Sequence, residues 1–494
     1  MSLAASLSLT VDEDNAVPIY LQIQQQICQL IQGGRLHAGD KLPSSRELAK
    51  SLGVSRTTSL KAYDNLVAEG LLLSLPKRGV FVARALPPMP GGRFADSRVH
   101  LLQNNVSPPE DAFDSGADVC AFPAKRWANS LRRSWLAPDP VLLRGDYVAG
   151  YPALKQQIAI YLNSLRGIDC EPGQILLTAG NRDALTIISH AVLKQQEGLY
   201  LENPCYRQMT SLFHHLGKTP LPLSVDAEGA LPPTDIPFQQ ALVVLTPGRQ
   251  YPLGMPMSSV RRQAWLNTIA NQEAKGAQLW VVEDDYDCEF LYQGRAHLPL
   301  IQQDGQRHVF FVGSFSKVMF RGLRLGFIVA PPDKVQLLEQ SQARLGSSVS
   351  LGLQSALSEF MASGEFAVHL RRMRRHYLQR RDWLCEQLSE LSPWLNFEKP
   401  GGGMHLVAYL HEPWQTMPDD NQCWDSRLAE AAARKGLHLP ILSNCYFTSP
   451  YRQGLLLGYS AAEEGTLLQA VKTLKSCLQA TLGSAAGLID DFTN

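Results

Sequence analysis

The chain has 494 residues, with 46 basic and 46 acidic side chains, and 45% of its residues are hydrophobic. It is too long for one hydrophobic core, so we expect two or three domains. Because the net charge is zero, the protein as a whole has no electrostatic attraction to nucleic acid, and any affinity for nucleic acid must come from a local basic region. No apolar run approaches membrane-spanning length, and we expect no transmembrane helix.

Cysteine usage is typical of a reducing compartment. The nine cysteines are odd in number, scattered along the chain and without a CxxC pair. That spacing argues against a disulfide framework and against a zinc site. The N-terminus, MSLAASLSLTVDEDNA, lacks the basic region of a secretory signal. We therefore expect a cytoplasmic protein without a metal site.

A helical module is predicted over residues 18–70. Apolar side chains recur at helical spacing from Ile19 to Ile31, before a Gly-Gly pair ends that helix. Two shorter helices follow, which Ser44 and Ser55 would cap. Two short helices joined by a glycine turn form a helix-turn-helix, whose second helix enters the major groove N-terminus first. We expect that helix to turn these apolar side chains inward: Leu60, Tyr63, Leu66 and Val67.

A basic β-hairpin is predicted after the helices. The segment LLLSLPKRGVFVA (71–83) alternates apolar and polar residues, with PKRG (76–79) at the tip. Between Arg35 and Arg84 there are nine basic residues against four acidic ones, so the neutral chain contains a basic module. The stretches LPSSRELAKSLGVSRTT and EGLL…KRGVFV resemble the winged helix-turn-helix of GntR-type regulators.

This resemblance implies that the module binds double-stranded operator DNA. Lys61 lies further along the second helix and is a further candidate contact. A winged helix can instead dock another protein, but the crowding of serine, arginine and threonine at the helix start favours the reading of base edges. The residues that would touch DNA by the resemblance are Arg46, Ser55, Arg56, Thr57, Thr58, Arg78 and Gly79.

Composition then divides the chain into three parts. Residues 1–83 hold the winged helix-turn-helix, and residues 84–112 combine Pro, Gly and charge without periodicity, which predicts a partly extended linker. From 113 to 494 helical and strand patterns alternate, which is the signature of a parallel α/β domain.

Two strand ends in this domain carry polar residues. In EPGQILLTAGNRDALTIISHAVL, a strand, a glycine turn and a helix succeed one another. The backbone N–H groups of Gly180 and Asn181 would open that helix and form an anion site. The segment LYLENPCYRQM ends another strand beside Tyr206 and Arg207.

The segment LWVVEDDYDCEF (279–290) runs from four apolar residues straight into a group of acids. A carboxylate at this strand end can pair with a protonated pyridine nitrogen and make the ring an electron sink. A tyrosine beside it can hydrogen-bond the phenolic oxygen of the ring. Acidic residues at strand ends can also cap a following helix or simply lie solvent-exposed in a loop.

The segment VFFVGSFSKVMFRGLRLGFIVA (309–330) places a lysine between two apolar runs. Open α/β sheets bind ligands at the carboxyl ends of their strands, where Ser314, Ser316 and Lys317 would lie. The set suits a phosphorylated aldehyde, because the amine forms a Schiff base while Arg324 and the hydroxyls hold the phosphate. A surface loop with a solvated lysine is the alternative.

The order of acid, tyrosine, lysine and arginine resembles fold-type I pyridoxal-phosphate enzymes, the aspartate aminotransferase group. Because this pattern follows a GntR-like N-terminus in the same chain, the chain resembles the MocR/GabR family of regulators over nearly its whole length. The motifs that carry this resemblance are RGDYVAGYPALK (144–155), TAGNRDAL (178–185), ENPCY (202–206), TPGRQYPLG (246–254), EDDYDCEF (283–290), SFSKVMFRGLRLGF (314–327) and GGGMHL (401–406).

The resemblance implies an α/β fold with large and small subdomains, a homodimer and bound pyridoxal 5'-phosphate. Lys317 would form the Schiff base, Asp284 would face the pyridine nitrogen and Tyr286 the ring oxygen. Tyr206 would stack near the ring. The phosphate would be bound by Ser314, Ser316, Arg324, Gly180 and Asn181.

Two stretches depart from the pattern of the family. Arg182-Asp183 stands where the family often has two glutamines, and Gly248-Arg249 where it often has Ser-His. Aminotransferases of this type also use a late arginine for the substrate carboxylate. Here YRQGLLLGYS offers only Arg452, slightly out of register, so Arg207 and Arg249 are alternative partners for an acid group of the effector.

The family implies a transcription regulator in which an amine or amino-acid-like effector, or pyridoxal phosphate itself, acts at Lys317 and repositions the DNA-binding modules. The rival is a true aminotransferase with an accessory DNA-binding domain, since the lysine, aspartate and tyrosine are all present. A third class is a cofactor-free scaffold. The sequence leaves the effector, the operator sequence and the choice between activator and repressor open.

Overall fold

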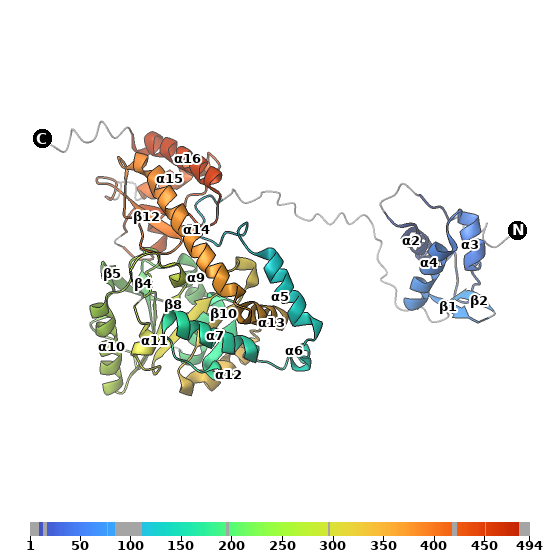
Figure 1. Ribbon diagram of the computed structural model, residues 1–494, viewed down its shortest axis with the longest axis horizontal. Helices are drawn as coiled ribbons and strands as arrows, with labels where there is room; N and C mark the ends of the chain where they lie inside the picture. The colour runs from blue at the N-terminus through green and yellow to red at the C-terminus, as the bar shows by residue number, and fades with distance from the viewer. Residues whose placement is uncertain are drawn as a thin grey trace. The chain divides into compact units, whose positions relative to one another are not determined.

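The computed structural model describes residues 9–12, 17–76, 78–83, 111–193, 197–294, 297–416, 422–449 and 451–483. The chain divides into two compact units, residues 1–105 and 106–494 (Figure 1). Most of the predicted linker, 84–110, lies outside the described residues. Its last residue, Ala112, is buried in the core of the second unit.

The first unit is the predicted winged helix-turn-helix. In the part of this unit that the structure describes, three helices pack around a core that includes Ile23, Ile27, Leu48 and Leu66, and two strands pair antiparallel as the wing. The elements are α2 (Ile19–Gln32), α3 (Ser45–Leu52), α4 (Arg56–Ala68), β1 (Leu72–Leu75) and β2 (Gly79–Val82).

Both predicted helix caps are present. Ser44 and Glu47 form a capping box, in which the Ser44 N–H donates to Glu47 Oε2 at 2.9 Å and the Glu47 N–H donates to Ser44 Oγ at 3.3 Å. The Thr58 N–H donates to Ser55 Oγ at 3.1 Å and caps α4. Such caps satisfy backbone donors that the first helical turn leaves without partners.

The inward face of α4 differs from the prediction at Leu60, which is 43% exposed. The helix turns Tyr63 and Leu66 inward as predicted, together with Ser59 and Ala62, and Val67 is partly buried against the same core. Ser59 Oγ donates to Ser45 O at 2.7 Å. This buried polar contact with α3 occupies part of the inward face of α4, where the apolar pattern predicts Leu60.

The second unit is built on an eight-stranded sheet with the order β3-β10-β9-β8-β7-β4-β5-β6. Its strands are β3 (Ile175–Thr178), β4 (Gly198–Asn203), β5 (Leu221–Asp226), β6 (Gly229–Ala230), β7 (Gln240–Leu245), β8 (Gln278–Asp285), β9 (Val309–Ser314) and β10 (Gly326–Val329).

The sheet is mixed, which corrects the expectation of a parallel one. The five neighbours β9, β8, β7, β4 and β5 pair in parallel, whereas β10 runs antiparallel to β3 and β9, and β6 antiparallel to β5. A short loop joins β9 to β10, and a hairpin-like connection of that kind reverses the chain. The start of β10 therefore lies beside the end of β9, with Gly326 opposite Ser314.

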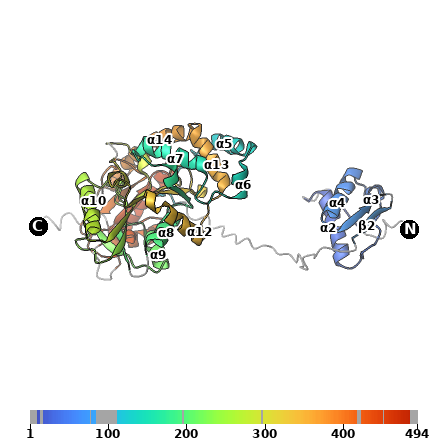
Figure 2. The same ribbon diagram turned by 90° about the horizontal axis from the view of Figure 1, so that it is seen from below.

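Both faces of the sheet are buried, as the apolar runs predict. Alternate residues of β9 show this, since Phe311 belongs to one core and Phe310 to the other. Figure 2 shows α7, α13 and α14 over one face and α8, α9 and α12 against the other. The helices are α5 (Ala124–Leu136), α6 (Pro140–Arg144), α7 (Pro152–Arg166), α8 (Asn181–Val192), α9 (Arg207–His215), α10 (Ser259–Ala274), α11 (Leu300–Gln303), α12 (Val335–Leu345), α13 (Leu351–Ala362) and α14 (Glu365–Leu388).

A smaller antiparallel sheet, of order β11-β12-β13, forms the small subdomain with two helices. Among the helices in the described ranges, none is long and apolar enough to cross a membrane. These elements are β11 (Leu395–Phe397), β12 (His405–Leu410), α15 (Trp424–Ala433), β13 (Gly454–Gly458) and α16 (Glu464–Leu482).

Candidate functional site

A cavity of about 540 Å³ lies where the central strands of the large sheet end. All nine residues that the sequence assigned to the cofactor line this cavity, although they come from four separate segments. They are Lys317, Asp284, Tyr286, Arg324, Ser314, Ser316, Gly180, Asn181 and Tyr206.

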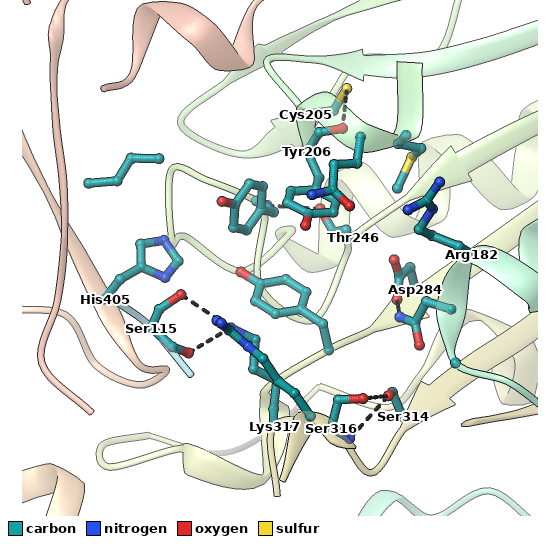
Figure 3. Close-up of a pocket in the computed structure, with 18 of the residues that line it drawn as sticks. Ser115, Arg182, Cys205, Tyr206, Thr246, Asp284, Ser314, Ser316, Lys317 and His405 are labelled. Carbon is teal, nitrogen blue, oxygen red and sulfur yellow. Dashed lines mark hydrogen bonds between the residues drawn. The ribbon is translucent and has the colours of Figure 1, made fainter. Parts of the chain in front are cut away.

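Lys317 lies three residues beyond the end of β9, and its side chain points into the cavity (Figure 3). Its Nζ donates to the backbone oxygen of Ser115 at 2.6 Å and to Ser115 Oγ at 3.1 Å. Burial lowers the pKa of the Lys317 ammonium to about 8, because a charged group loses its hydration there. A fraction of this amine is therefore uncharged and nucleophilic near neutral pH.

Asp284, near the end of β8, lies across the cavity from His405 and Ser115 (Figure 3). Asn181 Nδ2 donates to Asp284 Oδ1 at 2.6 Å. Burial, together with the charges of Asp285 and Glu202, raises the pKa of Asp284 to about 7. A positively charged ring nitrogen at this carboxylate would lower that pKa again, because it favours the ionised form.

The buried hydroxyl of Tyr286 has no hydrogen-bond partner among the described residues. Its oxygen is buried, and burial raises the pKa of the phenol well above its ordinary value. A buried hydroxyl without a hydrogen bond is costly, so it marks a place where a ligand atom fits.

A group of residues around the start of α8 is suited to binding an anion. Gly180 has φ +91°, and a Cβ there would lie 3.7 Å from Arg324 Nη1, so the guanidinium lies close to the start of α8. Arg324 itself has φ 51° and ψ 39°, a left-handed conformation that costs a non-glycine residue about 1 kcal/mol or more. Ser314 Oγ and Ser316 Oγ are 3.1 Å apart. A helix N-terminus, an arginine and two hydroxyls together form a phosphate cradle.

Several residues that line the cavity were not foreseen from the sequence. Glu202 and Thr246 stand at the ends of β4 and β7, so the rule that found Asp284 also applies to them. Ser115 comes from a segment without periodicity. His405 Nε2 donates to Pro252 O at 2.8 Å, and burial keeps the pKa of His405 well below its ordinary value, so this imidazole is neutral. The neutral imidazole adds no charge to the cavity.

The three arginines considered for an effector acid group do not line this cavity. Arg207 is exposed at the start of α9, and the Arg452 guanidinium lies 3.9 Å from the ring centroid of Tyr409. Arg249 is buried, and its Nη2 donates to His405 O at 2.9 Å. The arginines that line the cavity are Arg182, Arg321, which pairs with Asp114, and Arg324.

In the first unit, the candidate DNA contacts fall into two groups. Ser55 and Thr58 take part in the cap of α4, and the Lys61 ammonium lies 4.0 Å from the ring centroid of Tyr20. Lys77, at the wing tip, lies outside the described residues. The remaining candidates are exposed at the start of α3, at the start of α4 and on the wing, and they are Arg46, Arg56, Thr57, Arg78 and Gly79.

Comparison with known proteins agrees with both units. Residues 19–82 match the gntR family of bacterial regulatory proteins, and residues 122–438 match aminotransferase class I and II. The chain is 32% identical to "Probable rhizopine catabolism regulatory protein MocR" of Rhizobium meliloti, covering 98% of this chain and 99% of that one. It is 28% identical to "HTH-type pyridoxine biosynthesis transcriptional regulator PdxR" of Corynebacterium glutamicum, covering 94% and 96%.

Among solved structures, the α-aminoadipate aminotransferase LysN of Thermus thermophilus superposes with a TM-score of 0.64 at 22% identity, over 75% of this chain and 92% of that one. That likeness shows the fold alone. A GntR-type winged helix on an aminotransferase-like domain defines a class of DNA-binding transcriptional regulators. Within that class, the chain belongs to the MocR family.

Proposed function

We propose that this regulator binds pyridoxal 5'-phosphate covalently through Lys317, and that an amine or amino-acid-like effector acting on the bound cofactor changes its affinity for operator DNA. The observation that carries the proposal is the shared cavity, in which an amine, a buried acid, a hydroxyl without a partner and a phosphate cradle line one space. Each of these groups matches one part of the cofactor.

The residues present fit the cofactor at each end. The free hydroxyl of Tyr286 can donate to the phenolic oxygen of the ring, and Asp284 can hold a proton on the pyridine nitrogen. Arg324, Ser314 and the start of α8 can bind the phosphate. When bound, the cofactor supplies an aldehyde carbon that forms and exchanges covalent bonds with amines.

The residues of the chain then control the exchange between amines. Lys317 contributes the resident amine, and Ser115 accepts hydrogen bonds from that amine whenever it is free. Arg182 and Arg321 also line the cavity, so they can hold an anionic group of an effector. The contacts of Ser115, Arg182 and Arg321 would differ between the state in which Lys317 is bonded to the cofactor and the state in which its amine is free. An effector can shift a conformational equilibrium only if its interactions differ between the two states.

On the DNA side, the exposed starts of α3 and α4 and the wing would contact an operator in the cytoplasm. Fold-type I domains associate in pairs by the family resemblance, so the protein would act as a homodimer. A dimer of winged helices then requires two half-sites, whose spacing reflects the geometry of the dimer.

The names of the relatives offer two effector classes. The PdxR relative is named for pyridoxine biosynthesis, and the MocR relative for rhizopine catabolism. Either the cofactor itself or an amine that reacts with it is compatible with the cavity.

The test is to reduce the full-length protein, loaded with pyridoxal phosphate, with borohydride and to locate the cofactor by peptide mass spectrometry. We expect one labelled peptide, carrying the cofactor on Lys317, and no label in Lys317→Ala. A protein that takes up no cofactor, or that carries it on another lysine, contradicts the proposal.

A true aminotransferase is the second candidate, because Lys317, Asp284 and Tyr286, the residues that such an enzyme would use, all line the cavity. Sustained multiple turnovers between an amino acid and a keto acid would establish it. A single half-reaction without turnover is the outcome expected of a sensor.

A further inference from the structure

Residues 111–118 are the stretch through which the chain enters the aminotransferase-like domain, and we call them the entry segment. They follow residues 84–110, which join this domain to the winged helix-turn-helix. The entry segment contains no helix or strand, although Phe113 within it is 1% exposed and belongs to the core of the domain. Its position therefore depends on individual contacts with the surrounding elements.

The small subdomain holds the entry segment by two hydrogen bonds. The Gly458 N–H, at the end of β13, donates to Phe113 O at 3.0 Å, and Ser460 Oγ donates to Gly116 O at 2.7 Å. A Cβ on Gly458 would lie 2.4 Å from Phe113 O, so the two backbones are in direct contact. These bonds attach the segment to β13 and to the residues just after it.

The last residue of the entry segment, Asp118, is held by α14. The Asp118 N–H donates to the Tyr377 hydroxyl at 2.9 Å. Asp118 Oδ2 lies 2.9 Å from His376 Nε2 and accepts from Arg380 Nη2 at 3.3 Å. Asp118 is 4% exposed, so this end of the segment is fixed inside the domain.

Between these attachments, two cations of the large subdomain contact the segment. Arg321 Nη2 pairs with Asp114 Oδ1, but the arginine side chain is 63% exposed, and water weakens a pair of that kind. Lys317 Nζ donates to Ser115 O at 2.6 Å and to Ser115 Oγ at 3.1 Å inside the cofactor cavity (Figure 3). Hydrogen bonds from a charged donor are stronger in such a place.

A lysine nitrogen cannot keep both of these hydrogen bonds when it is bonded to an aldehyde carbon. The free ammonium has three hydrogens. When a carbon–nitrogen double bond forms, the aldehyde oxygen leaves as water with two of those hydrogens, so the nitrogen keeps at most one. An amine that takes over the carbon returns Lys317 with two hydrogens, or three once it is protonated. The contact with Ser115 therefore differs between the two states of Lys317.

We propose that the entry segment senses, through Ser115, whether the Lys317 nitrogen is free or bonded to the cofactor. A free nitrogen holds the middle of the segment against the large subdomain. A bonded nitrogen releases it, while the contacts with β13 and α14 remain. An effector that frees Lys317 would re-form the contact at the point where the chain leads to the DNA-binding unit. The inference rests on the proposed function, because it requires the cofactor on Lys317.

Amide hydrogen exchange of the full-length protein, followed by mass spectrometry of peptides that cover 111–118, tests the proposal. The reporters are the Asp114 N–H, which donates to Asp111 O at 2.8 Å, and the Gly116 N–H, which donates to Asp114 Oδ1 at 3.0 Å. Loading with pyridoxal phosphate should speed their exchange about tenfold, since a charged donor no longer holds the segment. Exchange at the start of α8, where the phosphate would bind, should slow in the same sample. Opposite changes in one sample exclude a general loosening.

Lys317→Met, measured without cofactor, tests the contact by itself, because methionine has no N–H group to donate. Its entry segment should exchange about tenfold faster than that of the cofactor-free wild type. The matched control, Lys472→Met, replaces an exposed lysine of α16 and should exchange like the wild type. Unchanged exchange in a folded Lys317→Met variant overturns the proposal whether or not the cofactor binds.

Peptide mass spectrometry of the same loaded sample after borohydride reduction separates this inference from the proposed function. A protein that carries the cofactor on Lys317, yet keeps the cofactor-free exchange rate at 111–118, overturns the role of the entry segment alone. A protein that takes up no cofactor contradicts the proposed function, and the switch with it. If Lys317→Met does not fold, the comparison of loaded and cofactor-free wild type decides.

Discussion

The half-buried Lys317 sets the pH range over which the proposed cofactor can be attached. Burial lowers the pKa of its ammonium to about 8, and only the uncharged amine attacks an aldehyde. The ammonium predominates below that pKa, so the rate of attachment should rise as the pH rises through about 8 and level off above it. Stopped-flow absorbance with added pyridoxal phosphate, followed from well below to well above that pKa, measures this. A rate that is flat or falls over the range is inconsistent with Lys317 as the attacking amine.

Arg324 is expected to act on the phosphate alone. Its guanidinium lies at the start of α8, so Arg324→Ala should weaken binding of pyridoxal phosphate roughly tenfold or more through loss of a charged hydrogen bond. Binding of pyridoxal, which has no phosphate, should change little. Equilibrium titration of both ligands compares the two losses. Equal losses for the two ligands would show that Arg324 supports the fold of the site rather than the phosphate.

The sequence predicted the residues of this site that lie at the ends of buried strands or just beyond them. Lys317 and Asp284 stand out because a polar residue after an apolar run lies at the ligand-binding edge of an α/β sheet. Ser115 could not be found in this way, since it reaches Lys317 from a segment without helix or strand periodicity. Arg249 follows β7 and obeys the same rule as Asp284, yet its guanidinium does not line the cofactor cavity, because it packs against Gly403 and Gly254 and donates to His405 O.

At the scale of the element, the start of the recognition helix α4 depends on one serine. Ser55→Ala removes the acceptor for the Thr58 N–H and should destabilise the first turn by about 1 kcal/mol. Amide hydrogen exchange in that turn should become roughly fivefold faster, whereas Ser55→Asp, which supplies another cap, should exchange like the wild type. Unchanged exchange in Ser55→Ala means that tertiary packing, not the cap, holds the turn.

Arg56 is the exposed first residue of the same helix, and we propose that it contacts DNA rather than stabilises the fold. Arg56→Ala should weaken operator binding by the full-length protein roughly tenfold or more, through loss of base or phosphate contacts. The cofactor should remain bound, because the substitution lies in the other unit. A mobility-shift titration at physiological salt measures the effect. Normal binding by this variant would show that another element reads the operator.

The existence of the elements was easier to predict than their directions and faces. Apolar runs identify β9 and β10, but only pairing shows that β10 runs antiparallel, which brings Arg324 to the same edge as Lys317. Similarly, Leu60 fits the apolar pattern of α4, but the Ser59 contact to α3 rotates that face, and Leu60 remains 43% exposed. Both differences arise from tertiary contacts, which local periodicity does not contain.

At the scale of the whole molecule, the chain joins two compact units with different tasks. The first exposes the side chains suited to DNA, and the second encloses the proposed cofactor site. Regulation requires that a ligand at one site changes the affinity at the other, and the coupling must be reciprocal. An operator with two half-sites should therefore raise the affinity of the protein for its effector as much as the effector raises its affinity for the operator.

The most direct test is the affinity of the full-length, cofactor-loaded protein for the DNA upstream of its own and neighbouring genes, measured against a panel of primary amines and amino acids. We predict that at least one of these amines changes the operator affinity of the wild type severalfold and leaves that of Lys317→Ala unchanged. The same change in Lys317→Ala would contradict the account, because the effector would then act without the amine at the centre of the site.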